Sequence, residues 1–191
     1  GWCDLGYNFV VDKWGNIYEG RANSLTQPVV GAHAGGFNTG TVGVAMLGTY
    51  DALPSAATQR SVAAIIGWRL GAYGADPSGS MTYATGDGGV GVRYKNQTVL
   101  LPRVFGHRDV WFTACPGNGG EAALPNIRAM GHPFAGPLPP THSLARAVAG
   151  DPACFFRALG GPATTRTSEA FRCRIPVPPA RRFFGQSRSG P

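Results

Sequence analysis

The stretch Gly106-His107-Arg108-Asp109-Val110-Trp111-Phe112-Thr113-Ala114-Cys115-Pro116-Gly117 carries the strongest signal in this chain of 191 residues. It places an imidazole, His107, a short distance before a thiol, Cys115. Zinc accepts both ligand types in tetrahedral sites, and catalytic zinc keeps one position open for water. A His and a Cys at this spacing are more often unrelated than joint ligands, so the pair alone is weak evidence for a metal.

Upstream of this stretch, the apolar pattern predicts short strands and one long helix. Residues 7–12 and 17–19 are β-prone and are separated by a Gly-containing turn, which predicts a hairpin. Residues 41–47 form a nearly continuous apolar run between glycines, typical of a strand covered on both faces. Ser55 can cap a helix whose apolar residues, Val62, Ile65, Ile66 and Leu70, repeat at i, i+3, i+4 spacing.

Nearer the His–Cys stretch, residues 82–85 and 90–94 predict a second hairpin, and 104–105 predict a strand leading into it. Residues 121–130 predict a final helix. Residues 86–91 match G-x-G-x-x-G literally. A dinucleotide site requires a helix after that loop, whereas residues 92–94 are β-prone, so we interpret the match as a turn.

Composition excludes several classes of protein. The chain is 43% hydrophobic and 14% charged, enough for a packed core, and no apolar run approaches the ~20 residues of a membrane helix. Residues 1–132 hold nine Lys and Arg against eight acidic residues, whereas 133–191 hold eight Arg against two. The basic charge therefore belongs to a Pro- and Arg-rich tail, which we expect to be mostly disordered, and nucleic acid is not an expected partner.

Further motifs precede the His–Cys stretch in a fixed order: Asp4-Leu5-Gly6-Tyr7-Asn8-Phe9, Ile17-Tyr18-Glu19-Gly20-Arg21, Gly31-Ala32-His33-Ala34, Asn38 and Val42-Gly43-Val44. Together with it they resemble the peptidoglycan recognition protein family, which includes zinc-dependent N-acetylmuramoyl-L-alanine amidases of the type 2 class. The resemblance covers about residues 1–130. Residues 76–102 resemble the longer hairpin of bacterial, especially actinobacterial-type, members.

The resemblance implies an α/β fold with a central mixed β-sheet flanked by helices, over a domain of residues 1–132 followed by the tail. The implied activity is hydrolysis of the amide between N-acetylmuramic acid and L-alanine in peptidoglycan, with one Zn²⁺. The implied protein is a secreted, wall-associated monomer. Its basic tail either adheres to anionic wall polymers or has no partner.

Residue roles follow from the same resemblance. His107 and Cys115 would be zinc ligands, and Tyr7 would hydrogen-bond the attacking water or the developing oxyanion. Thr113 would add a second hydrogen bond, although a loop hydroxyl bonded to nearby backbone explains it equally well. The substrate groove would be lined by Arg21, His33, Asn38 and Trp111, for which ordinary surface or loop roles stay open. Arg108 and Asp109 could brace the loop beside the ligands.

Family amidases have a further His ligand on a strand upstream of the GYNF motif. This sequence starts after that point, so we expect an N-terminally truncated domain that lacks its first strand and helix, with an incomplete metal site. Two other interpretations remain open: a peptidoglycan-binding module without catalysis, and a cysteine hydrolase with Cys115 as nucleophile and His107 as base. Cys154 and Cys173 could form a disulfide or stay reduced, and Cys3 would be unpaired.

Overall fold

The computed structural model describes residues 4–133 and 141–143. Strands and helices alternate irregularly along the chain, and their bounds are β1 (Phe9–Val11), β2 (Ile17–Glu19), β3 (Val44–Met46), α1 (Ala56–Gly71), β4 (Ser80–Ala84), β5 (Thr98–Pro102), α2 (His107–Val110), α3 (Asn118–Met130) and β6 (Thr141–Ser143). None of the helices in the described ranges combines the length and the apolar composition needed to cross a bilayer.

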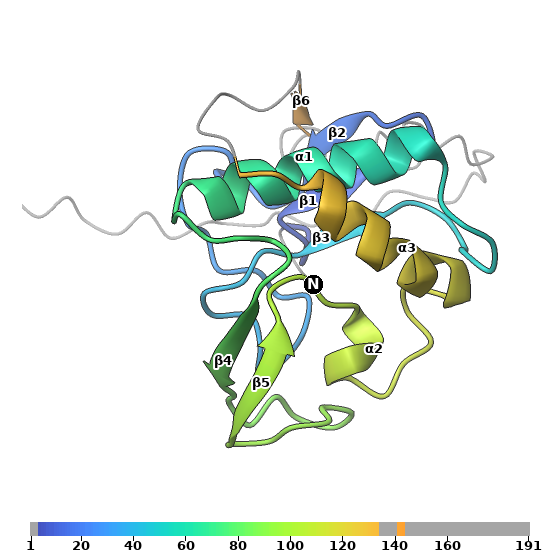
Figure 1. Cartoon of the computed structure of the whole chain (residues 1–191). Coiled ribbons are helices and arrows are strands. Elements are labelled where there is room, and N and C mark those ends of the chain that lie inside the picture. Colours follow the sequence, from blue (N-terminus) through green and yellow to red (C-terminus); the bar gives the residue numbers. More distant parts are fainter. Residues whose placement is uncertain (1–3, 134–140, 144–191) are drawn as a thin grey trace, which may run out of the picture.

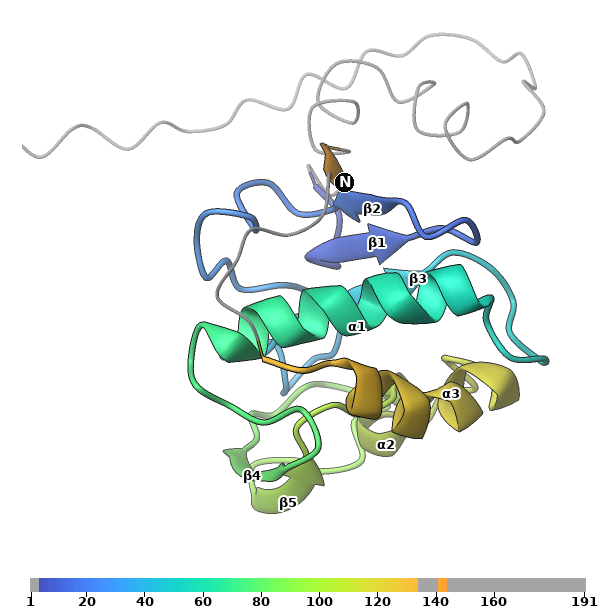
Figure 2. The same cartoon turned by 45° about the horizontal axis from the view of Figure 1, so that its top comes forward.

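The larger sheet has the strand order β3-β1-β2-β6. Strands β1 and β2 are antiparallel, whereas β3 runs parallel to β1 and β6 runs parallel to β2. Helix α1 packs against β1 and β3, and α3 packs on α1, so that α1 lies between the sheet and α3 (Figures 1 and 2). The expectation of an α/β fold with a central mixed sheet is therefore confirmed.

The main core lies where α1 meets the sheet and α3. Its buried side chains come from all three layers: Phe9, Val11 and Ile17 from the sheet, Val62, Ala63 and Ile65 from α1, and Ala123 and Ile127 from α3. The predicted first hairpin is confirmed by the β1–β2 pairing. The predicted cap is confirmed as well, because the Thr58 amide donates to the Ser55 hydroxyl at 3.0 Å.

The prediction of a strand covered on both faces over residues 41–47 is wrong in length and in burial. Strand β3 has three residues, and all of them are half-buried. It pairs with β1 alone among the described strands, and its side chains line a pocket. The open pocket explains why such an apolar run is left partly uncovered.

The second hairpin forms with a different partner from the one predicted. Strand β4 pairs with β5 in the register Thr82↔Leu100, not with residues 90–94. Residues 86–91 make a loop in which Gly88, Gly89 and Gly91 have positive φ, and Val92 instead makes an isolated bridge to Trp111. The apolar run of β5 thus takes the place in the sheet that sequence reasoning assigned to residues 90–94.

Residues 104–105 are not a strand, contrary to prediction. The guanidinium of Arg128 donates to the Val104 carbonyl at 2.9 Å and 2.6 Å, while Phe105 packs edge-on against Phe37. The bonds from Arg128 occupy the Val104 carbonyl, which a neighbouring strand would need as an acceptor. The last helix, α3, begins three residues before the predicted start at 121.

The predicted tail of residues 133–191 is described only in part. Residues 141–143 form β6 beside β2. The predicted adhesion of the tail and the pairing of Cys154 with Cys173 concern residues outside the described ranges, as does Cys3.

Candidate functional site

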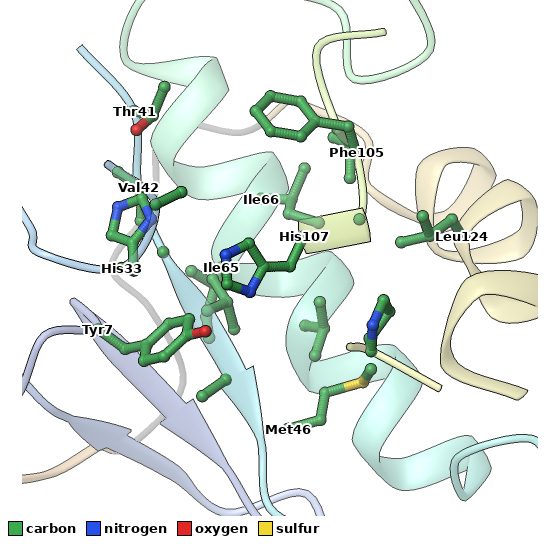
Figure 3. Close-up of a pocket in the computed structure, with 18 of the residues that line it drawn as sticks. Tyr7, His33, Thr41, Val42, Met46, Ile65, Ile66, Phe105, His107 and Leu124 are labelled. Atoms are coloured by element: carbon green, nitrogen blue, oxygen red, sulfur yellow. The ribbon is translucent and has the colours of Figure 1, made fainter. Parts of the chain in front are cut away.

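A pocket of about 830 Å³ opens between β3, α1, α3 and the segment that leads into α2. Most of its lining is apolar, but Tyr7, His33, His107 and Cys115 gather in it. Figure 3 shows the Tyr7 hydroxyl and the His107 imidazole pointing into the same space, with His33 beside Tyr7. Four residues singled out by sequence thus meet in one place, although they are far apart along the chain.

The imidazole of His33 is held by stacking and by two glycines. Its ring stacks on Tyr7 with centroids 5.7 Å apart and an angle of 28° between the planes. A Cβ atom at Gly31 or at Gly43 would lie 2.4 Å from Cδ2 of His33, so a side chain at either position would displace the ring. Burial, followed by the positive charges of His107 and Arg21, lowers the pKa of His33 from 6.5 to about 4. His33 is therefore neutral at physiological pH.

Burial also favours the neutral forms of three side chains near His33 in this pocket, namely Tyr7, His107 and Cys115. Burial raises the pKa of Tyr7, and the nearby Cys115 raises it further, so the phenol keeps its proton and can donate it in a hydrogen bond. Burial lowers the pKa of His107. Desolvation raises the pKa of the Cys115 thiol, and the charge of Arg108 acts in the opposite direction. Tyr7 and Cys115 line the same pocket.

The donor atoms fit zinc in chemistry but fall short in number. The Nε2 atoms of His33 and His107 are buried without any hydrogen-bond partner. Buried imidazole nitrogens normally have a partner, and a metal ion is one that suits them. Cys115, a free cysteine with an exposed side chain, is a soft donor that zinc accepts. Within the described ranges, however, no three His, Cys, Asp or Glu side chains come close enough to hold a metal.

The loop that carries Cys115 is tied back to α2. The Cys115 amide donates to the Thr113 hydroxyl at 3.2 Å, which is the backbone-bonding role left open for Thr113. The Cys115 carbonyl accepts from the Arg108 amide at 2.9 Å. His107 is the first residue of α2, a single helical turn, and the Gly106 amide before it donates to the Asp109 carboxylate at 2.8 Å.

Three of the four expected substrate residues line a second, smaller pocket. It measures about 300 Å³ and includes His33, Asn38, His107 and Trp111. Asn38 also has a structural role, because its side-chain oxygen accepts from the His33 and Ala34 amides at 2.9 and 2.8 Å. The Trp111 indole donates to the Gly35 carbonyl at 3.0 Å, which leaves the ring as a wall of this pocket.

Arg21 and Thr113 line neither of these two pockets. The Arg21 guanidinium donates to the Leu5 carbonyl at 3.1 Å, and its charge acts on His33. Arg21 therefore lies beside the site, where it supports the chain segment just before Tyr7.

Asn8 is a residue whose role sequence reasoning missed. It is fully buried, and its amide group donates to the Ser24 hydroxyl at 3.1 Å and to the Val29 carbonyl at 2.9 Å. Its side-chain oxygen accepts from the Gly43 amide at 3.0 Å. These bonds fix β1, and with it Tyr7, relative to the segments on either side of His33. The sequence contains a sign of this role, because Asn8 is a polar residue inside the apolar run of the GYNF motif.

Similarity to known proteins identifies the family of this chain. Residues 2–118 match the family Amidase_2, described as N-acetylmuramoyl-L-alanine amidase. Peptidoglycan-recognition protein SC2 of Drosophila melanogaster is 32% identical over 117 residues, which cover 61% of this chain and 50% of that protein. N-acetylmuramoyl-L-alanine amidase of Homo sapiens is 48% identical over 63 residues, covering 32% of this chain and 10% of that protein.

Among solved structures, N-acetylmuramoyl-L-alanine amidase LysC from Clostridium intestinale URNW is 26% identical with a TM-score of 0.43, covering 65% of this chain and 62% of that chain. The chain spans about half the length of the fly protein, and a bacterial origin stays a prediction. Because the family match covers residues 2–118 of 191, the chain belongs to the N-acetylmuramoyl-L-alanine amidase family.

Proposed function

We propose that this chain hydrolyses the amide bond between N-acetylmuramic acid and L-alanine in peptidoglycan, and that His107 and Cys115 contribute to holding a Zn²⁺ for the reaction. The observation that carries the proposal is the buried, unpartnered Nε2 of His107 in a pocket shared with Tyr7 and Cys115. Membership of the amidase family supports the reaction class. Bound there, Zn²⁺ would supply a Lewis acid that lets water act as a nucleophile near neutral pH.

The residues of the chain would position the substrate and stabilise charge. Tyr7 stays protonated because its pKa is raised, so its phenol can donate a hydrogen bond to the oxygen that gains negative charge. The smaller pocket beside His33 and Trp111 would hold the muramyl peptide, with the indole ring as a flat apolar wall. Thr113 would take part through its bond to the Cys115 amide, which restrains the loop.

The same proposal puts the protein outside the cell, where peptidoglycan lies, with peptidoglycan as its partner. The basic residues of 133–191 are then candidates for adhesion to anionic wall polymers, since they carry eight Arg against two acidic residues.

The test is hydrolysis of a purified N-acetylmuramoyl peptide, followed by the appearance of the free L-alanine amine. We expect activity that is lost with a chelator and restored by Zn²⁺. Tyr7→Phe removes the donated hydrogen bond while keeping the ring, so we expect kcat to fall by about 10²–10³. Tyr94→Phe, a change at a tyrosine that lines neither pocket, is the matched control and should leave kcat unchanged.

Two outcomes would contradict the proposal. Binding of insoluble peptidoglycan without any release of L-alanine, with Zn²⁺ present, would identify a binding module. Hydrolysis that survives the chelator but is abolished by alkylation of Cys115 would identify a cysteine hydrolase, in which that thiol is the nucleophile.

A further inference from the structure

Arg108 connects the two segments that carry the proposed metal donors. It directly follows His107 on α2, and its backbone amide donates to the Cys115 carbonyl at 2.9 Å. Its guanidinium donates to the Ala114 carbonyl at 2.5 Å and to the side-chain oxygen of Asn118 at 3.0 Å. One residue therefore reaches the Cys115 loop at two carbonyls and the first residue of α3 at a third point.

The guanidinium is held from its other side by Glu121, which lies in the first turn of α3. Nε of Arg108 and Oε2 of Glu121 are 3.8 Å apart, and the two side chains are only 26% and 29% exposed. Both atoms are buried and have no hydrogen-bond partner. At this distance the contact is an ion pair without a hydrogen bond. Because both side chains are partly buried, solvent and salt screen their attraction less than they would screen an ion pair on an open surface. The Asp109 carboxylate accepts a hydrogen bond from the Gly106 amide and not from the guanidinium of Arg108.

We propose that Arg108 is a positioning residue that sets the location of Cys115 relative to His107. The inference rests on the proposed function where it concerns the metal. Arg108 touches neither donor atom. It acts through the carbonyls of residues 114 and 115, so the loop cannot move away from α2 without breaking bonds to this one residue.

Only arginine fits this arrangement. The planar guanidinium offers donors in several fixed directions, and here they serve Ala114, Asn118 and the approach to Glu121. A lysine ammonium is a single point charge on a flexible stem and cannot reach all three at once. Arg108→Lys therefore keeps the charge and should still release the loop, which separates the geometry of the side chain from its charge.

The first measurement follows the tether itself, in the metal-free chain of 191 residues. Hydrogen exchange at the backbone amide of residue 108, corrected for intrinsic rate, reports its bond to the Cys115 carbonyl. We expect Arg108→Gln and Arg108→Lys to lose about tenfold in protection, and Asn118→Ala to lose less because one of the bonds is removed. Arg60→Gln, at an exposed position on α1, is the matched control and should leave this amide unchanged.

The second measurement follows the consequence for the metal, using Co²⁺ as the probe. Titration with Co²⁺ is read from the thiolate-to-cobalt charge-transfer band. Because the chain has four cysteines, the band is assigned to Cys115 by its loss in Cys115→Ser. We expect Arg108→Gln and Arg108→Lys to weaken Co²⁺ binding by about 10–100-fold and to alter this band, since groups that orient ligands have effects of this size.

Three outcomes would contradict either the role of Arg108 or the proposed metal site. Unchanged protection at residue 108 in Arg108→Gln would overturn the inference. So would a lower unfolding midpoint with an unchanged Co²⁺ affinity and band, because a merely structural role predicts that combination. Absence of the charge-transfer band in the unsubstituted chain would instead contradict the proposed metal site, and the exchange measurement alone would then decide whether Arg108 positions the loop.

Discussion

Stability against acid should depend on His33 more than on an ordinary histidine. In the folded chain its pKa is lowered from 6.5 to about 4, first by burial and then by the charges of His107 and Arg21. Tyr7 stacks on the same ring but stays neutral at acid pH. Between these two pKa values the unfolded chain binds a proton at residue 33 that the folded chain does not bind.

Above pH 6.5, residue 33 is unprotonated in both states, and the folded chain has its full stability. As the pH falls from 6.5 toward 4, the unfolded chain binds a proton at His33 and the folded chain does not, so the free energy of unfolding decreases. One pKa unit corresponds to about 1.36 kcal/mol, so the shift is worth about 3 kcal/mol in the free energy of unfolding. His33→Gln keeps a polar side chain of similar size and removes the titration.

The assay is urea unfolding between pH 7 and pH 4 in the presence of a chelator, so that no metal contributes. From pH 7 to pH 4 we expect the unsubstituted chain to lose about 3 kcal/mol more than His33→Gln does. His132→Gln, at an exposed histidine, is the control and should follow the unsubstituted chain. Equal losses in the unsubstituted chain and in His33→Gln would refute the reasoning.

Two further changes test how the site is supported. Asn8→Ala removes three buried or partly buried hydrogen bonds and leaves the Gly43 amide without its acceptor, so we expect a loss of about 3 kcal/mol in urea unfolding at pH 7; a loss below about 1 kcal/mol would show that water replaces these bonds. Ser55→Ala removes the cap that the Thr58 amide uses and the bond that the Ser55 hydroxyl donates to the Lys13 carbonyl, and we expect a loss of about 1–2 kcal/mol with unchanged amide hydrolysis; a change in kcat would show that these bonds also support the site.

Local patterns were enough to predict several parts of the molecule. The β1–β2 hairpin and the capped helix α1 form from neighbouring residues whose spacing is visible in the chain. The local spacing of His107 and Cys115 was only weak evidence for a metal; their role as ligands was implied by the family resemblance and stays a prediction. Their meeting with Tyr7 in one pocket was implied by the family resemblance, and the structure brings them together.

Pairings between distant segments were not predictable from those patterns. Residues 90–94 and 98–102 are both β-prone, but β4 pairs with the second, whereas Val92 makes an isolated bridge to Trp111. A local pattern measures the tendency to form a strand, whereas the partner depends on how the loop between the two segments folds.

The amino-acid sequence by itself determined which chemical groups the site contains, since imidazole, thiol and phenol are properties of single residues. Only the tertiary structure decided the protonation states of these groups and the hydrogen bonds that hold them in place. The lowered pKa of His33 and the unpartnered Nε2 of His107 arise from burial among segments remote in sequence. The bond from Asn8 to Gly43 spans 35 positions, and the one from Trp111 to Gly35 spans 76. Burial and hydrogen bonding depend on distance in space, and only the folded chain sets that distance.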